Sequence, residues 1–376
     1  MISRDNIQAL YGKKLTLSAS KIDRQAECRL SYFLRYGLRL DERREITVDP
    51  AEFGTYVHAV LEETAKEIKA LGGWHKISLE ATMDIAHRHS ENYAREHFSQ
   101  LDSTRLQYLF RRNGQELDAV VAELWSELSE SLFQPEFFEL AFGRNGAMPA
   151  IPTPGTAMDA SLEGFVDRVD RWKDYFRVVD YKTGKKDFDY CDIYNGVGLQ
   201  MLLYLFALER RGEKLLGGKG FSAGVQYFAA RFPMLTADGR LSPEKAQAER
   251  EKEIRRKGLI LGDGDVLEAM EPGGEFHRLS CKRKADGSVT GDIASREQLR
   301  LLEEYVFGLV GQLVDQIASG DVTANPYTRG SSHNACAFCP YGAVCSLTRE
   351  QGRRNYKAMS AQRFWEDVER QVKDHG

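Results

Sequence analysis

Residues 161–182, SLEGFVDRVDRWKDYFRVVDYK, constrain the fold of this chain more than any other stretch. Two runs with strand character, separated by a short polar break, predict a β-hairpin with one buried face. The runs cover residues 162–169 and 175–181. Asp167 lies inside the first run, whereas Asp180 and Lys182 end the second. Because side chains two apart in a strand share a face, Asp180 and Lys182 are expected to project together.

These charged residues suit a divalent cation. A carboxylate in the middle of a strand costs several kcal/mol of desolvation unless it is paired or binds a cation. Magnesium and manganese prefer hard oxygen ligands, and such an ion would activate water and screen a phosphate. A nearby lysine would stabilise developing negative charge or orient the water. An ordinary surface ion pair is the alternative, and the hairpin alone does not separate the two.

The composition is that of a soluble globular protein, with 42% hydrophobic and 29% charged residues among 376, enough for one large or two ordinary domains. The sequence has no apolar run near the roughly 18 residues of a membrane span and no apolar signal-peptide segment, so we expect a cytoplasmic protein without a membrane partner. The net charge of −4 gives no global sign of nucleic-acid binding, but a DNA path needs only a local basic strip. Basic residues cluster at Arg29, Arg35, Arg39, Arg43 and Arg44, and at Lys182, Lys185 and Lys186.

Helical periodicity surrounds the hairpin. Helices are expected within residues 17–40, 49–71, 78–142, 197–211 and 295–319, and a further strand of the same sheet at 224–232. The third helical region is interrupted near Asn113–Gly114 and at Pro135. Residues 233–292 are polar and glycine-rich. The sequence has no GxxxxGK[ST] loop, so we expect no ATP hydrolysis by this chain itself.

Three polar residues stand out within these helices. His58 lies beside an apolar stripe, where a lone histidine is more often a core residue than a ligand. Gln200 and Tyr204 are four apart and share a helix face. Buried polar groups need partners, but an ordinary core would also accommodate this pair.

Six cysteines occur, and Cys336, Cys339 and Cys345 form a C-x2-C-x5-C loop. In a reducing cytosol we do not expect disulfides. Three thiolates need a fourth ligand to complete a four-coordinate site. The candidates are Cys28, Cys191 and Cys281. Zinc and an iron–sulfur cluster both accept such ligands, and thiolate spacing alone does not separate them.

The order Asp167, then Asp180-Tyr181-Lys182, resembles the PD-(D/E)XK nuclease superfamily. Further segments resemble its RecB/AddB-type iron–sulfur nuclease domains, in the expected order between Leu17 and about Leu347. These segments are AECRLSYFLRYGLRL, GTYVH, GFVDRVD, VVDYKTG, LQMLLY, RRKGLILGDGDVLEAM, GDVTANPY and NACAFCPYGAVCS.

The resemblance implies a restriction-endonuclease-like α/β fold, in which helices flank a mixed central sheet. Residues 1–376 would form a single nuclease domain. The implied parts are a catalytic core at about 49–71 and 156–232, a helical insertion at about 78–142 and an iron–sulfur subregion at 17–44 and 326–350.

The resemblance also implies a metal-dependent DNA exonuclease. Mg²⁺ or Mn²⁺ would be bound by His58, Asp167, Asp180 and the Tyr181 carbonyl. Lys182 would orient water or stabilise the transition state, and Gln200 and Tyr204 would position the DNA strand. A 4Fe-4S cluster tying the two ends of the chain would be held by Cys28, Cys336, Cys339 and Cys345.

For partners, the resemblance implies DNA and an AddA-type subunit of a helicase–nuclease complex that processes double-strand break ends for recombinational repair. The chain would then be a fragment of a longer protein. Two alternatives stay open at this point. One is a non-catalytic iron–sulfur DNA-binding module, and the other is a stand-alone RecB-like or CRISPR-adaptation exonuclease.

Overall fold

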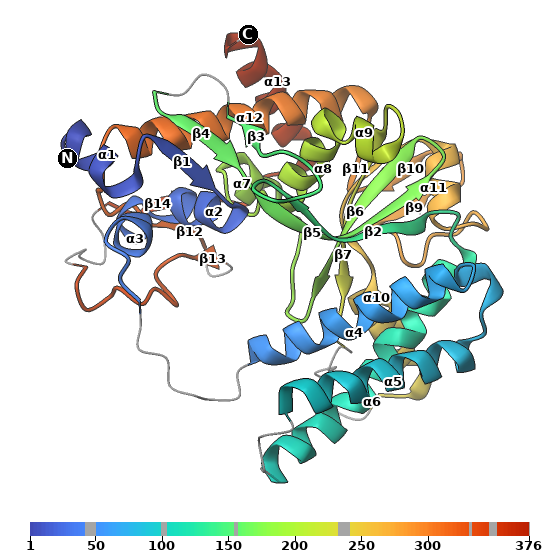
Figure 1. Ribbon diagram of the computed structural model, residues 1–376. Helices are drawn as coiled ribbons and strands as arrows, with labels where there is room; N and C mark the ends of the chain where they lie inside the picture. The colour runs from blue at the N-terminus through green and yellow to red at the C-terminus, as the bar shows by residue number, and fades with distance from the viewer. Residues whose placement is uncertain are drawn as a thin grey trace.

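The expected hairpin lies in the middle of a six-stranded mixed sheet (Figure 1). The computed structural model describes residues 1–41, 50–98, 104–153, 157–231, 241–330, 333–345 and 352–375. The strand order of the sheet is β11-β8-β7-β6-β5-β2. Its strands are β2 (Gln134–Phe142), β5 (Gly164–Trp172), β6 (Tyr175–Lys182), β7 (Phe221–Ala229), β8 (Lys257–Leu261) and β11 (Ile293–Ala294). This mixed sheet with flanking helices confirms the predicted α/β fold class.

Strand β6 is buried on both faces and divides its side chains between two cores. Phe176 and Val178 face one core, to which α2 (Ala19–Glu27), α7 (Tyr190–Tyr194), α8 (Gln200–Arg211), α12 (Arg296–Ala318) and α13 (Ala361–His375) contribute. Val179 and Tyr181 face the other, formed with α4 (Pro50–Ala70), α5 (Leu79–Phe98) and α6 (Thr104–Glu130). Figure 1 shows these two groups of helices on opposite sides of the sheet. β5 and β6 pair antiparallel as the hairpin, and β7 pairs parallel with β6 on its other side, so β6 is an interior strand of the sheet.

Several predicted helices are confirmed. α4, α8 and α12 match the regions expected at 49–71, 197–211 and 295–319. The region 17–40 is less regular, because it contains β1 (Lys14–Leu17), α2, α3 (Arg29–Tyr32) and a π-helical turn (Phe33–Gly37). Cys28 lies at the break between α2 and α3 with an extended backbone, φ −164° and ψ 119°. The cysteine therefore sits at a bend rather than on a helix face.

The prediction of helix up to Phe142 was wrong. Gln134–Phe142 forms the edge strand β2, antiparallel to β5, and α6 runs through Asn113–Gly114 without a break. Leu140 and Phe142 alternate into the core beside α8, which is strand rather than helix spacing. Pro135 is tolerated because it lies on an edge strand next to a register shift.

The polar region 233–292 also contributes to the sheet. Its short run GLIL fills β8, which pairs with β7 and β11. Smaller elements of the described chain are α1 (Arg4–Tyr11), β3 (Ile151–Pro152), β4 (Asp159–Leu162), α9 (Glu213–Leu216), α10 (Pro243–Ile254), α11 (Gly264–Met270), β9 (Cys281–Arg283) and β10 (Val289–Gly291). Near the C-terminus, β12 (Tyr327–Arg329) pairs with β13 (His333–Asn334) and β14 (Arg354–Tyr356). Within the described residues, no helix is long and apolar enough to cross a membrane.

A buried ionic network joins α6 to the sheet. Asp170 of β5 accepts hydrogen bonds from Arg168 at 3.0 Å and from Arg177 at 2.9 Å. Glu127 of α6 accepts from Arg177 at 2.6 Å and from Arg256 at 2.7 Å. Burial alone would raise the pKa of Glu127, but the guanidiniums of Arg256, Arg177 and Arg168 outweigh it and hold the pKa well below its usual range. Glu127 is therefore charged and paired in the folded protein.

Replacing Glu127 with alanine should lower the free energy of unfolding by about 3–5 kcal/mol, because it leaves guanidiniums buried without a counter-charge. Glu130, one turn further along α6, is exposed and pairs with Arg278. Its replacement with alanine should cost less than about 1 kcal/mol. Urea unfolding of both variants at one pH measures the difference, and equal losses would contradict the importance of the network.

Candidate metal centre

The candidate site lies where β5 and β6 separate. The two strands pair from Trp172↔Tyr175 to Arg168↔Val179, whereas β6 continues beside β7 as far as Lys182. At the separation, the Asp167 carboxylate accepts the backbone N–H of Tyr181 at 3.0 Å. A side chain thus takes the place that a backbone carbonyl of β5 would fill in a continued ladder.

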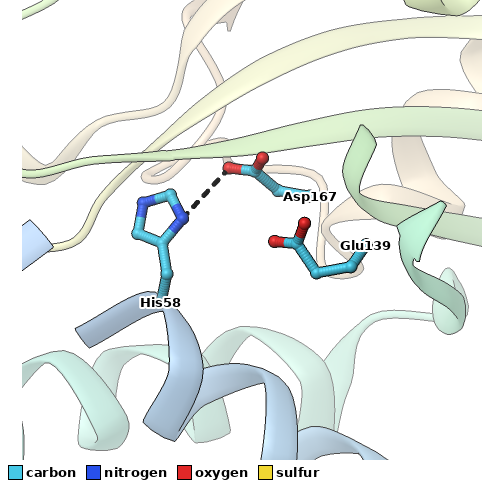
Figure 2. A group of neighbouring side chains, drawn as sticks. All are labelled: His58, Glu139 and Asp167. Carbon is cyan, nitrogen blue, oxygen red and sulfur yellow. Dashed lines mark ion pairs between the residues drawn. The ribbon is translucent and has the colours of Figure 1, made fainter. Parts of the chain in front are cut away.

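α4 brings His58 to the same point. Its Nδ1 lies 3.5 Å from Asp167 Oδ2, and its Nε2 lies 2.7 Å from the Tyr181 carbonyl oxygen. A neutral ring that donates its Nε2 hydrogen to this carbonyl keeps the Nδ1 lone pair directed toward the carboxylate (Figure 2). A histidine held by a carbonyl in this way is typical of metal ligands. The Tyr181 carbonyl, expected as a ligand itself, accepts this bond and keeps a second lone pair.

Asp180 and Lys182 project from the same face of β6, as expected. Lys182 Nζ lies 2.6 Å from Asp180 Oδ2. Gln200, at the start of α8, donates from Nε2 to Asp180 Oδ1 at 3.4 Å. Burial, and then the charge of Asp167, raise the pKa of Asp180 to about 6 despite the nearby Lys182 ammonium. Tyr204, one turn further along α8, lies against Gly164 of β5, where an added Cβ would come within 3.0 Å of its hydroxyl.

Glu139 belongs to the same site, although it was not predicted from the sequence. It lies on β2 with a left-handed φ of 43°, and its register neighbours Phe138 and Leu140 pair with β5 on either side. One ligand atom each of His58, Glu139 and Asp167 lies within 4.8 Å of the others. Figure 2 shows the Glu139 and Asp167 carboxylates close together on one side of the imidazole. Loss of surrounding water, and then the charge of Asp167, raise the pKa of Glu139 to about 7.

A signal for Glu139 was present in the sequence. Residues 134–142, QPEFFELAF, contain an acid within an apolar run, the same signal that marked Asp167. Because residues 134–142 were predicted to be helical, Glu139 was not identified as an acid inside a strand. A left-handed backbone is disfavoured at residues other than glycine, and such conformations concentrate at functional sites.

The residues present fit a divalent cation. His58, Glu139 and Asp167 bring an imidazole and two carboxylates together, and Mg²⁺ and Mn²⁺ accept such oxygen-rich sets; Asp180 and the Tyr181 carbonyl are the further candidates, outside this close group. Burial and repulsion by the Asp167 charge favour the protonated forms of Asp180 and Glu139, and the ammoniums of Lys182 and Lys66 offset this only in part. A bound cation would relieve this repulsion.

A second group of candidate ligands lies between the two ends of the chain. Cys28 and the loop residues Cys336, Cys339 and Cys345 line one small cavity, together with Leu30, Leu34, Pro326 and Tyr341 among others. Burial, and also the neighbouring Cys28, Cys339 and Cys345 thiols, raise the pKa of Cys336. Cys191 lies elsewhere, near the hydroxyl of Tyr327, and Cys281 is in β9. The four cysteines that the family resemblance implied thus line the same cavity.

Polar contacts also hold this subregion together. His333 lies between Glu27 and Asp192, at 3.1 and 3.2 Å. Hydrogen bonds to Asp192 and then to Glu27 raise the pKa of His333 to about 9, so the ring is positively charged near neutral pH. The Tyr341 hydroxyl donates to the Leu40 carbonyl at 2.8 Å.

The basic residues near these sites are partly paired. Arg29 and Arg35 form ion pairs with Asp321 and Asp41. Lys185 lies 3.7 Å from Glu253. Arg43 and Arg44 lie outside the described residues. The predicted basic strip therefore stays a prediction.

The chain is similar to known nucleases. Residues 16–346 match the family model of the PD-(D/E)XK nuclease superfamily. Its curated relatives include B subunits of ATP-dependent helicase/deoxyribonucleases, among them those of Moorella thermoacetica, 33% identical over 94% of this chain, and Clostridium novyi, 30% identical over 97%. A third, from Symbiobacterium thermophilum, is 32% identical over 98%. These alignments cover 32–33% of the relatives, so the chain spans about a third of their length.

The raised pKa values predict a pH-dependent metal affinity. Below pH 6–7, a cation must displace protons from Asp180 and Glu139, whose pKa values are about 6 and about 7. Mn²⁺ affinity measured by calorimetry should rise about a hundredfold between pH 5.5 and 7.5, and then level off.

Glu139→Gln is the matched control for this titration. It removes the group with the higher pKa, so the same pH interval should change the affinity by only about fourfold. A pH-independent affinity in the unmodified chain would overturn the metal-centre assignment. An unchanged slope in the variant would remove Glu139 from it.

Proposed function

The chain belongs to the PD-(D/E)XK nuclease superfamily, and on that premise we propose that it is a metal-dependent deoxyribonuclease that hydrolyses phosphodiester bonds. One observation carries the proposal: where β5 and β6 separate, Asp167 accepts the N–H of Tyr181, and the two residues beside Tyr181, Asp180 and Lys182, form an ion pair. A module that only bound DNA would have no need of carboxylates beside the phosphate, since they would repel it. The set therefore favours hydrolysis over the non-catalytic alternative.

We assign each side chain a role from its contacts. Asp167, Asp180, Glu139 and His58 would hold Mg²⁺ or Mn²⁺, with the Tyr181 carbonyl as a further ligand. The bound ion would supply Lewis acidity toward the phosphodiester and would acidify water. Lys182 keeps its ammonium beside Asp180 and is partly exposed, so it can donate a hydrogen bond to the attacking water or to a phosphate oxygen. Gln200 would hold the second oxygen of Asp180, and Tyr204 packs against Gly164 of β5.

The reaction would be an in-line attack of water on phosphorus. The P–O bond to the 3′-oxygen breaks, which leaves a 5′-phosphate and a 3′-hydroxyl. Attack at chain ends, as in an exonuclease, is part of the proposal.

The relatives suggest the setting of this activity. Their name describes the B subunit of an ATP-dependent helicase/deoxyribonuclease. We propose that this chain likewise works with an AddA-type helicase–nuclease partner on DNA ends at double-strand breaks, during recombinational repair. Because the chain covers about a third of such relatives, the remaining two thirds would lie outside the nuclease region. A DNA substrate and free thiols both favour the cytoplasm.

We further propose that Cys28, Cys336, Cys339 and Cys345 hold a 4Fe-4S cluster. The four thiols line one cavity, and thiolates are the usual ligands of such clusters. In the unfolded chain, closing a loop of about 300 residues between Cys28 and Cys336 costs about 5–6 kcal/mol of conformational entropy. Bonds between iron and these thiolates would offset that entropy and fix the two ends of the nuclease domain against each other. This structural role requires no electron transfer.

Replacing Asp180 with alanine should lower Mg²⁺-dependent cleavage of labelled single-stranded DNA by at least about a thousandfold, because the metal site loses a ligand and Lys182 its partner. DNA binding, measured by fluorescence anisotropy without Mg²⁺, should be retained. Asp174→Ala, at the exposed turn of the same hairpin, is the control and should cleave normally. Unchanged turnover in Asp180→Ala would overturn the site assignment. An unmodified chain that binds DNA but never cleaves it would support the non-catalytic module.

Anaerobically purified protein should contain about four iron atoms per chain and show broad visible absorbance from iron–thiolate bonds. Cys28→Ser should lose the iron and melt at a lower temperature. Cys191→Ser should keep the iron, because this buried cysteine lies outside the set. One zinc per chain in place of iron would establish the zinc alternative.

A further inference from the structure

Phe165 is an unusual side chain beside the candidate metal centre. It lies in β5, two residues before Asp167, and 62% of its surface is exposed. Among the exposed large hydrophobic residues of the described chain, it alone belongs to a β-strand. Its neighbour Val166 is completely buried. Leaving a phenylalanine in water forgoes the free energy that burial would provide, so its position needs a reason.

The strand geometry places Phe165 on the side of the metal centre. Val166 packs into the core beside α8, and a Cβ at Gly164 would lie 2.7 Å from the Tyr204 ring of α8. Gly164 and Val166 thus face α8, so Phe165 between them projects from the opposite face of β5, the face on which His58 of α4 contacts Asp167. Two residues of strand span about 6.7 Å, or about two nucleotide rises of 3.4 Å. Phe165 is thus within reach of a nucleotide whose phosphate lies at Asp167.

The backbone around Phe165 is held although its side chain is not covered. Phe165 pairs with Ala141 of β2, and a Cβ at the preceding Gly164 would lie 3.0 Å from the Tyr204 hydroxyl. The Tyr204 ring meets Phe142 edge-on, with centroids 5.5 Å apart, and closes over Gly164. The exposed ring therefore stands on a fixed backbone, which lowers the entropy lost when a ligand stacks on it.

We propose that Phe165 is a positioning residue that stacks on a nucleobase next to the scissile phosphate and favours single-stranded DNA. The proposal rests on the proposed nuclease function. Every base has a π face, so stacking of this kind tolerates any sequence. In a duplex, the bases already stack on one another and their faces are not available to Phe165. The residue would therefore act through substrate binding, and the bond-breaking step would proceed without it.

Kinetics of three variants test this role. Phe165→Ala should raise KM for a single-stranded oligonucleotide by about 5- to 150-fold, with kcat within about threefold of the unmodified chain. Phe165→Leu keeps an apolar side chain without a π face, so it should behave like the alanine variant. Phe165→Trp keeps a π face, so its KM should match that of the unmodified chain. For a blunt duplex, all three should stay within about threefold of the unmodified chain.

A binding readout separates this proposal from the nuclease proposal. In the double variant Asp180→Ala, Phe165→Trp, an oligothymidine should quench the added tryptophan fluorescence, and a blunt duplex should not. Asp180→Ala alone provides the background of the four native tryptophans. If the double variant shows this quenching but the unmodified chain does not cleave DNA, the stacking role of Phe165 is supported and the nuclease proposal fails. A cleaving chain in which all Phe165 variants keep their KM, with no specific quenching, would overturn the role of Phe165 and leave the nuclease intact.

Discussion

The site depends on the separation of two strands that are neighbours in the hairpin. Beyond Arg168 and Val179, the β5–β6 ladder gives way to side-chain hydrogen bonds. Asp167 accepts the N–H of Tyr181, and His58 contacts its carbonyl oxygen. Buried backbone groups need partners, and these side chains supply them where a neighbouring strand no longer does. The strand ends can therefore part while the N–H and C=O of Tyr181 keep partners, and the Asp167 carboxylate lies beside that of Glu139 at the opening.

Helices packed on both faces of the sheet place side chains at this opening. α4 packs on one face through residues such as Val57 and Leu61, and presents His58 to β6. α8 packs on the other face and presents Gln200 to Asp180. The ionic network reaches the same strand, because Arg168 donates to the Tyr181 hydroxyl at 3.1 Å. Each polar group at the site is thus fixed by an element whose own position is set by a core or a buried ion pair.

Elements formed by interactions that are local in the sequence could be predicted, whereas those that depend on distant residues could not. The hairpin and the helices α4, α8 and α12 rest on local periodicity, so the sequence predicts them well. β2 and β8 form strands through pairing with β5 and β7, which are distant in the sequence. The short apolar runs of β2 and β8, next to proline or glycine, do not by themselves indicate this pairing. Glu139 was missed with β2 for this reason. The pairing of Cys28 with a loop about 300 residues away came from family resemblance, since local spacing carries no information about so distant a contact.

The cysteine subregion and the metal centre are physically joined through Asp23. This residue of α2 lies five positions before Cys28 and accepts the N–H groups of Gly198 and Leu199 at 2.9 and 3.4 Å. These two residues directly precede α8, whose first residue is Gln200. Burial raises the pKa of Asp23 to about 6, with Lys186 opposing, so ionisation costs folding free energy as the pH rises from about 4 to 6. The Asp23 carboxylate hydrogen-bonds α2 to the residues that precede α8, and so fixes the position of one helix relative to the other. Whatever holds Cys28 in place therefore also constrains the helix that orients Asp180.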